Sequence, residues 1–153
     1  MPPGTNTQRR PKKVLAFGTF DLLHPGHRSF LRQAKKLGHK LIVAVGRDHV
    51  VAKLKGHRPH QPERHRRKVV AELPYVHAAV LASKNPKHRF SFIKKHNPDV
   101  IALGYDQKHF AQNLRRDLQK RRIFSQVVRL KPHFPQRYKS SIIRRRVNQT
   151  TTT

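Results

Sequence analysis

Two histidines, His24 and His27, flank a proline and a glycine in the string HPGH. Each imidazole can donate a hydrogen bond, or bring a positive charge, to the oxygens of one bound phosphate. If a nucleophile attacks the phosphorus there, charge grows on those oxygens and preorganised donors stabilise it. The pair therefore indicates phosphate chemistry, and the alternative is a helix-capping His24 beside a surface His27. Because the chain has 12 histidines, the longer string GTFDLLHPGH is more informative than the pair.

The elements around this string place it at the end of a strand. The unbroken apolar run from Val14 to Phe17 is typical of a strand buried on both faces, and Gly18 permits a sharp turn and a close ligand approach. Pro25 suits the first turn of a helix, and apolar residues then recur at helical spacing until Gly38. The tetrad is thus predicted at a helix N-terminus beyond a strand, where free N–H groups favour phosphate.

The rest of the chain repeats this alternation. Strands are predicted at 14–17, 41–45, 78–82, 100–103 and 124–130, and helices at 25–37, 62–73, 89–96, 107–122 and 141–147. Residues 50–61 are predicted to be a lysine-bearing loop that ends in turn formers. Five strands that alternate with helices favour an α/β fold with a parallel sheet.

Length and composition limit the other possibilities. The 153 residues suit one domain, and the absence of cysteine excludes disulfides and thiolate chemistry. No apolar run approaches membrane-spanning length, and the first residues lack the apolar core of a secretory signal, so we expect a cytoplasmic protein. A flexible basic tail (1–12) and a disordered tail (148–153) are expected to flank a domain over 13–147.

The charge is strongly unbalanced. Lys and Arg number 35 against 7 Asp and Glu, a net charge of +28, and the basic residues are spread along every segment. Such an excess predicts non-specific, salt-dependent binding to nucleic acid and other polyanions. Acidic residues are rare, but Asp21 and Asp106 lie within motif-like strings. This pattern suggests that the surface lost its acids around a retained active site, either by engineering or in an unusually basic protein. The rival explanation is a nucleic-acid-binding function, although no known nucleic-acid-binding motif supports it.

GTFDLLHPGH resembles the signature of the cytidylyltransferase-like nucleotidyltransferases, which include glycerol-3-phosphate cytidylyltransferases and archaeal-type FAD synthases. The similarity runs from about Lys13 to Val147. It implies a Rossmann-like domain, a five-stranded parallel sheet of order 3-2-1-4-5 with helices on both faces, and a crevice between the first and fourth strands. The strings GYDQ (104–107) and RYKSS (137–141) favour the FAD-synthase-like branch.

The resemblance also implies an activity. A nucleoside monophosphate moves from a nucleoside triphosphate to a phosphate-bearing substrate, and pyrophosphate leaves. ATP and FMN, giving FAD, are the preferred pair, with Mg²⁺ accompanying the triphosphate. CTP with glycerol 3-phosphate is the runner-up, and a basic nucleic-acid-binding protein on an inactive fold is the alternative of another class. Relatives are often dimers, which implies a possible homodimer.

Roles for individual residues follow from the same resemblance. His24 and His27 are expected to stabilise the transferring phosphate, while Lys55 (or Lys53) and Arg66 neutralise the β and γ phosphates. Asp106 is expected to bind the ribose, the base or Mg²⁺, and its alternative role is a helix N-cap. The other residues expected to line the nucleotide are Gly18, Thr19, Phe20, Pro25, Gly26, Tyr138, Ser140 and Ser141.

Overall fold

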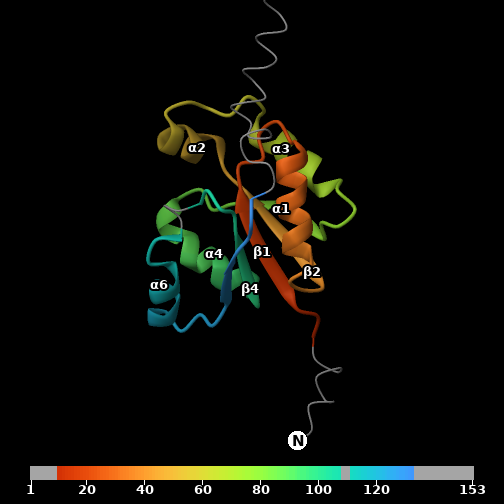
Figure 1. Ribbon diagram of the computed structural model, residues 1–153. Helices are drawn as coiled ribbons and strands as arrows, with labels where there is room; N and C mark the ends of the chain where they lie inside the picture. Colours follow the sequence, from red (N-terminus) through yellow and green to blue (C-terminus); the bar gives the residue numbers. More distant parts are fainter. Residues whose placement is uncertain (1–9, 108–110, 133–153) are drawn as a thin grey trace, which may run out of the picture.

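The computed structural model describes residues 10–107 and 111–132. Its strands form one parallel sheet of order β3-β2-β1-β4-β5, which confirms the predicted Rossmann-like α/β architecture (Figure 1). The strands are β1 (Lys13–Gly18), β2 (Lys40–Val45), β3 (Ala78–Leu81), β4 (Val100–Leu103) and β5 (Gln126–Arg129). In the centre, β1 pairs with β2 along its whole length, from Lys13↔Lys40 to Gly18↔Val45. Its pairing with β4 runs only from Val14↔Val100 to Ala16↔Ala102.

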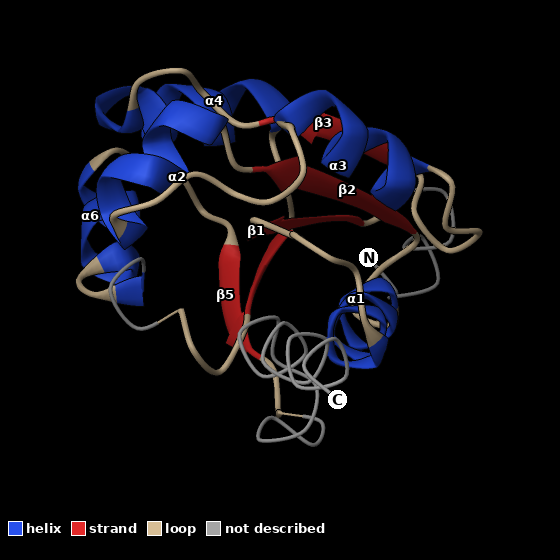
Figure 2. Cartoon of the chain, turned by 90° about the horizontal axis from the view of Figure 1, so that it is seen from above, coloured by secondary structure: helices blue, strands red, loops and turns tan. Residues whose placement is uncertain are grey.

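Helices cover both faces of this sheet. Within the described ranges they are α1 (Pro25–Lys35), α2 (Asp48–Lys55), α3 (Glu63–Ala71), α4 (Arg89–His96) and α6 (Leu114–Lys120), with a 3-10 turn η2 (Pro86–His88) before α4. Seen from above, α1 lies on one side of the sheet, and α4 and α6 lie on the other (Figure 2). No helix in these ranges is long and apolar enough to cross a membrane.

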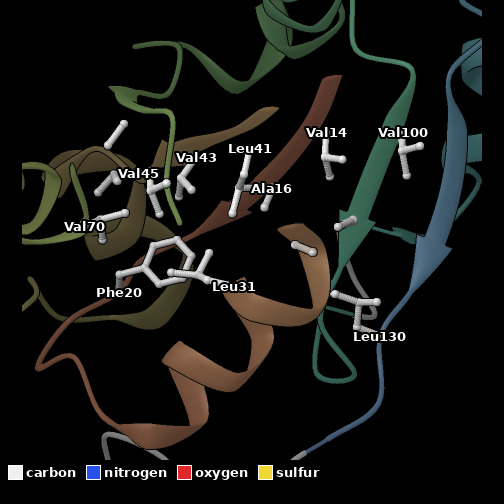
Figure 3. Close-up of a cluster of buried hydrophobic side chains, with 14 residues drawn as sticks. Val14, Ala16, Phe20, Leu31, Leu41, Val43, Val45, Val70, Val100 and Leu130 are labelled. Carbon is white, nitrogen blue, oxygen red and sulfur yellow. The ribbon is translucent and has the colours of Figure 1, made fainter. Parts of the chain in front are cut away.

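The alternation of side chains along β1 gives the domain two apolar layers. Val14 and Ala16 pack with α1 and α3 in one cluster, where Phe20 lies beside Leu31 (Figure 3). Leu15 and Phe17 point to the opposite face and pack with α4 and α6. Because successive residues of a strand point to opposite faces, both layers hold β1 in place. The carboxyl end of β1, from which the following turn begins, is therefore held in place on both faces of the sheet.

Two sequence predictions were wrong in detail. Part of the segment expected to be a loop is helix α2. Only Val51 of this helix is buried, so its sequence lacks the apolar periodicity that would have indicated a helix. The helix predicted over 107–122 is interrupted: Asn113 has a left-handed backbone (φ 59°), and α6 begins only at Leu114. The predicted helix over 141–147, together with Tyr138, Ser140 and Ser141, lies outside the described residues.

Candidate active site

The first turn of α1 is capped by its own two histidines. His24 is the N-cap, and its Nδ1 accepts hydrogen bonds from the backbone N–H groups of Gly26 (3.1 Å) and His27 (3.4 Å). In return, Nδ1 of His27 accepts from the backbone N–H of His24 (3.4 Å). The arrangement is a capping box made of imidazoles. The structure thus confirms that His24 caps the helix, which the sequence had offered as the alternative to phosphate binding.

This capping box changes how the helix can meet a phosphate. The N–H of Arg28 donates to the carbonyl of His24, and Pro25 has no N–H. Every backbone donor of residues 24–28 is therefore already used within the turn. The expectation that free backbone N–H groups face the phosphate was wrong, because the imidazoles occupy those groups.

The same hydrogen bonds fix the tautomer of both rings. A neutral imidazole that accepts at Nδ1 has its proton on Nε2. The two rings are stacked, with centroids 3.7 Å apart and planes at 23°. His24 Nε2 is buried and has no hydrogen-bond partner in the described part of the chain. A buried donor without a partner is costly, so this N–H is suited to a ligand oxygen.

Burial keeps both histidines uncharged. Loss of hydration lowers the pKa of His24 from 6.5 to about 4. The pKa of His27 is lowered to about 3, mainly by loss of hydration and to a smaller extent by the charges of His24 and Lys55. Both rings are consequently neutral hydrogen-bond donors at neutral pH. The Lys55 ammonium, at the last residue of α2, is one of the charges that act on His27.

A strained turn supports His27 from the other side. Phe20 has a left-handed backbone (φ 53°), and its ring lies against His27, with centroids 5.6 Å apart and planes at 71°. The ring also covers Gly18, where a Cβ would lie 2.6 Å from Phe20. Any larger residue at position 18 would displace the ring, so this glycine is required for the packing around His27.

Arg66 does not face the ligand side as expected. Its side chain is fully buried, and its guanidinium donates to the carbonyls of Gln61 (2.8 Å), Thr19 (2.7 Å) and Gly46 (2.8 Å). It also forms an ion pair with Asp48 at 2.7 Å. The expectation of a direct contact with the β and γ phosphates conflicts with this geometry, because protein acceptors already surround the guanidinium. Arg66 instead joins the ends of β1 and β2.

Helices α2 and α3 cap each other beside Arg66. The Glu63 carboxylate accepts the backbone N–H of Asp48 (2.8 Å), and the Asp48 carboxylate accepts the N–H of Glu63 (3.2 Å). Arg47 adds an ion pair to Glu63 at 3.2 Å. Acidic groups at helix N-termini are favourable, and here two of them satisfy one another's helices. The result is a fixed start for α2, whose other end holds Lys55.

Asp21 has a role that the sequence did not reveal. Its buried carboxylate accepts the backbone N–H groups of His60 (2.8 Å) and Gln61 (3.0 Å). The Gln61 side chain then accepts the N–H of Leu22 (3.2 Å). Asp21 thereby ties the turn after β1 to the segment that follows α2. The sequence signal that could have indicated this role is the presence of an aspartate at position 21 in a chain with only seven acidic residues.

Asp106 differs from most acids of this chain. Among the seven, all within the described residues, five bond to protein N–H or cationic groups: Asp21, Asp48, Glu63, Asp99 and Asp117. Asp106 is exposed beyond the end of β4, and the N-cap position of α6 is Asn113, seven residues further along the chain. Because β1 and β4 are parallel neighbours, Asp106 and the turn after β1 belong to the same edge of the sheet.

No group of three His, Asp or Glu side chains within 10–107 and 111–132 can hold a metal ion. The donors in the described part of the site thus do not fit a resident metal centre.

The fold and the imidazole pair define a nucleotide-binding α/β domain, and the chain belongs to the cytidylyltransferase-like family, whose model matches residues 15–146. Among curated proteins, it is 48% identical to an FAD synthase of Ferroglobus placidus, over 78% of this chain and 76% of that protein. An FAD synthase of Thermococcus sibiricus is 38% identical, over 89% and 88% of the two chains. A crystal structure described as the lipopolysaccharide core biosynthesis protein from Thermoplasma volcanium is 35% identical. It covers 81% of this chain and 99% of its own, with a TM-score of 0.75.

Proposed function

We propose that this chain is an FMN adenylyltransferase, which transfers AMP from ATP to the phosphate of FMN. An FMN phosphate oxygen attacks the α-phosphorus of ATP, the bond from that phosphorus to the bridging oxygen breaks, and pyrophosphate leaves with the electron pair. FAD is the other product. The observation that supports this most strongly is the pair of stacked imidazoles with Nε2–H donors beyond the end of β1. The similarity to archaeal FAD synthases supports the choice of ATP and FMN.

The two imidazoles supply hydrogen bonds where charge develops. Backbone N–H groups of Gly26 and His27 donate to Nδ1 of His24, and the N–H of His24 donates to Nδ1 of His27. These bonds polarise each ring and strengthen Nε2–H as a donor to the α-phosphate oxygens. The FMN phosphate is already ionised near neutral pH, so the attack needs no protein base. Neutral rings also avoid placing two positive charges side by side before the substrate arrives.

Lys55 and Asp106 complete the proposed site from opposite sides. Lys55 brings a positive charge close to His27, where it would neutralise the β and γ phosphates. Asp106 would accept hydrogen bonds from the ribose or the base, or contact Mg²⁺ that arrives with ATP. The ion neutralises phosphate charge and makes pyrophosphate a better leaving group. Gly18, Thr19, Phe20, Pro25 and Gly26 shape the turn around the phosphates. Tyr138, Ser140 and Ser141 remain proposed nucleotide contacts.

The test is product analysis with purified protein, Mg²⁺ and moderate salt. ATP and FMN should give FAD and pyrophosphate, whereas CTP with glycerol 3-phosphate should give little product. Turnover of the second pair alone would contradict the choice of substrates.

The net charge of +28 adds a second, separable property. We expect salt-sensitive binding of nucleic acid that is spread over the surface. The double variant His24→Ala/His27→Ala should lose transfer and keep this binding. Loss of both together would favour a nucleic-acid-binding function at the same site.

A further inference from the structure

A side-chain amide links the central strand to its neighbour β4 just beyond their last paired residues. The pairing of β1 with β4 ends at Ala16↔Ala102, although both strands continue. Just beyond, Gln107 Nε2 donates to the carbonyl of Phe17 at 2.8 Å, and Gln107 Oε1 accepts the N–H of Gly104 at 2.7 Å. One carboxamide thus offers the donor and the acceptor that a neighbouring peptide group would offer.

The inserted amide lies at the point where ligands bind in this architecture. The sheet order changes direction at β1, with β2 on one side and β4 on the other, and such a switch point is where α/β sheets hold nucleotides. Gln107 is also directly next to Asp106. Both crowd Gly104: a Cβ there would lie 3.1 Å from Asp106 Oδ1 and 3.6 Å from Gln107 Oε1. The positions of these two side chains and of the turn 104–107 therefore depend on one another.

We propose that Gln107 is a positioning residue for nucleotide binding, which sets the spacing of the carboxyl ends of β1 and β4 and holds Asp106 at that edge of the sheet. This inference rests on the proposed function. Gln107 acts through the strand ends and not by contact with the reacting atoms. Its effect should thus appear in the affinity for ATP, with little effect on kcat.

The chemistry of the amide suggests two informative variants. Gln107→Met keeps the length of the side chain and removes both hydrogen bonds. Gln107→Glu keeps the acceptor for Gly104, but its ionised form has no donor for the Phe17 carbonyl. Protonation restores that donor, so the second variant can be rescued by lowering the pH.

The experiment measures the Kd of MgATP by calorimetry, together with KM and kcat in the FAD assay. We expect Gln107→Met to raise Kd and KM by about tenfold and to leave kcat nearly unchanged. Gln119→Met, on the exposed side of α6, is the matched control and should change neither value. Gln107→Glu should resemble Gln107→Met near about pH 8 and move toward the wild type as the pH falls toward about 4.3, the ordinary pKa of a glutamate, with each Kd taken relative to wild type at the same pH.

The outcomes separate this inference from the proposed function. An unchanged Kd in Gln107→Met, or a Kd of Gln107→Glu that does not recover at low pH, would overturn the positioning role. If the wild type binds ATP but makes no FAD, the proposed function fails, and the calorimetric comparison still decides the role of Gln107.

Discussion

His24 combines two roles that one substitution can separate. His24 Nδ1 caps α1, and Nε2–H is the donor proposed for the α-phosphate. Asparagine is a strong N-cap, so His24→Asn keeps an acceptor for the first turn but has no group that reaches the position of Nε2. We expect its stability to lie within about 1 kcal/mol of wild type. We expect kcat to fall by about 10²–10³, the cost of removing one preorganised donor to a developing charge.

The assay is FAD formation with saturating ATP and FMN, beside thermal unfolding of the same preparation. His24→Ala should lose the cap as well, with an added cost of about 1 kcal/mol in stability. His77→Asn, an exposed histidine before β3, is the control and should behave as wild type in both measurements. If His24→Asn retains most of its kcat, or loses activity only as it unfolds, the donor role of Nε2–H is refuted.

Three further predictions follow from the site. Because the folded pKa values of His24 and His27 (about 4 and 3) lie below 6.5, the unfolded chain binds more protons in that window. Stability should be complete above about pH 6.5 and fall below it by up to about 1.4 kcal/mol per pH unit for each ring; urea midpoints that stay level to pH 4 would contradict this. Lys55→Ala should raise the KM for ATP about tenfold and raise the pKa of His27 in NMR titration, while Lys53→Ala should do neither. Arg66→Ala should lower the free energy of unfolding by about 3–5 kcal/mol in urea titration, because it leaves a carboxylate without its buried partner. A stable variant with only a raised KM would instead favour direct phosphate contact by Arg66.

Local patterns were sufficient for much of the fold. The apolar runs that became β1 and β4 are buried on both faces, and α4 has the predicted bounds 89–96. These features depend on residues that are close in sequence, so composition and periodicity indicate them. The strand order came from the family resemblance, since pairing between distant strands leaves no local signal.

Features that depend on distant partners could not be predicted. The start of α2 depends on the exchange of hydrogen bonds between Asp48 and Glu63, which are 15 residues apart. The burial of Arg66 depends on carbonyls of Thr19 and Gly46 that come together only in the folded sheet. Arginine is usually exposed or bound to phosphate, so its residue type favoured the wrong location.

The histidine pair was predicted as a phosphate site, but its hydrogen bonding was not. From the sequence, capping and phosphate binding were two alternatives for His24. In the structure the two nitrogens of His24 differ: Nδ1 caps the helix, and the buried Nε2 is available to a ligand. The residue type alone does not show whether Nδ1 or Nε2 of a histidine faces the backbone or a ligand.

The most direct test of the proposed chemistry uses ATP labelled at the α-phosphate, with FMN as acceptor and Mg²⁺ present. We expect the label to appear in FAD, with one pyrophosphate released for each FAD formed, and the His24→Asn variant to form FAD far more slowly. Label that reaches only a product of hydrolysis, or a folded wild type that makes no FAD, would contradict adenylyl transfer to FMN at this site.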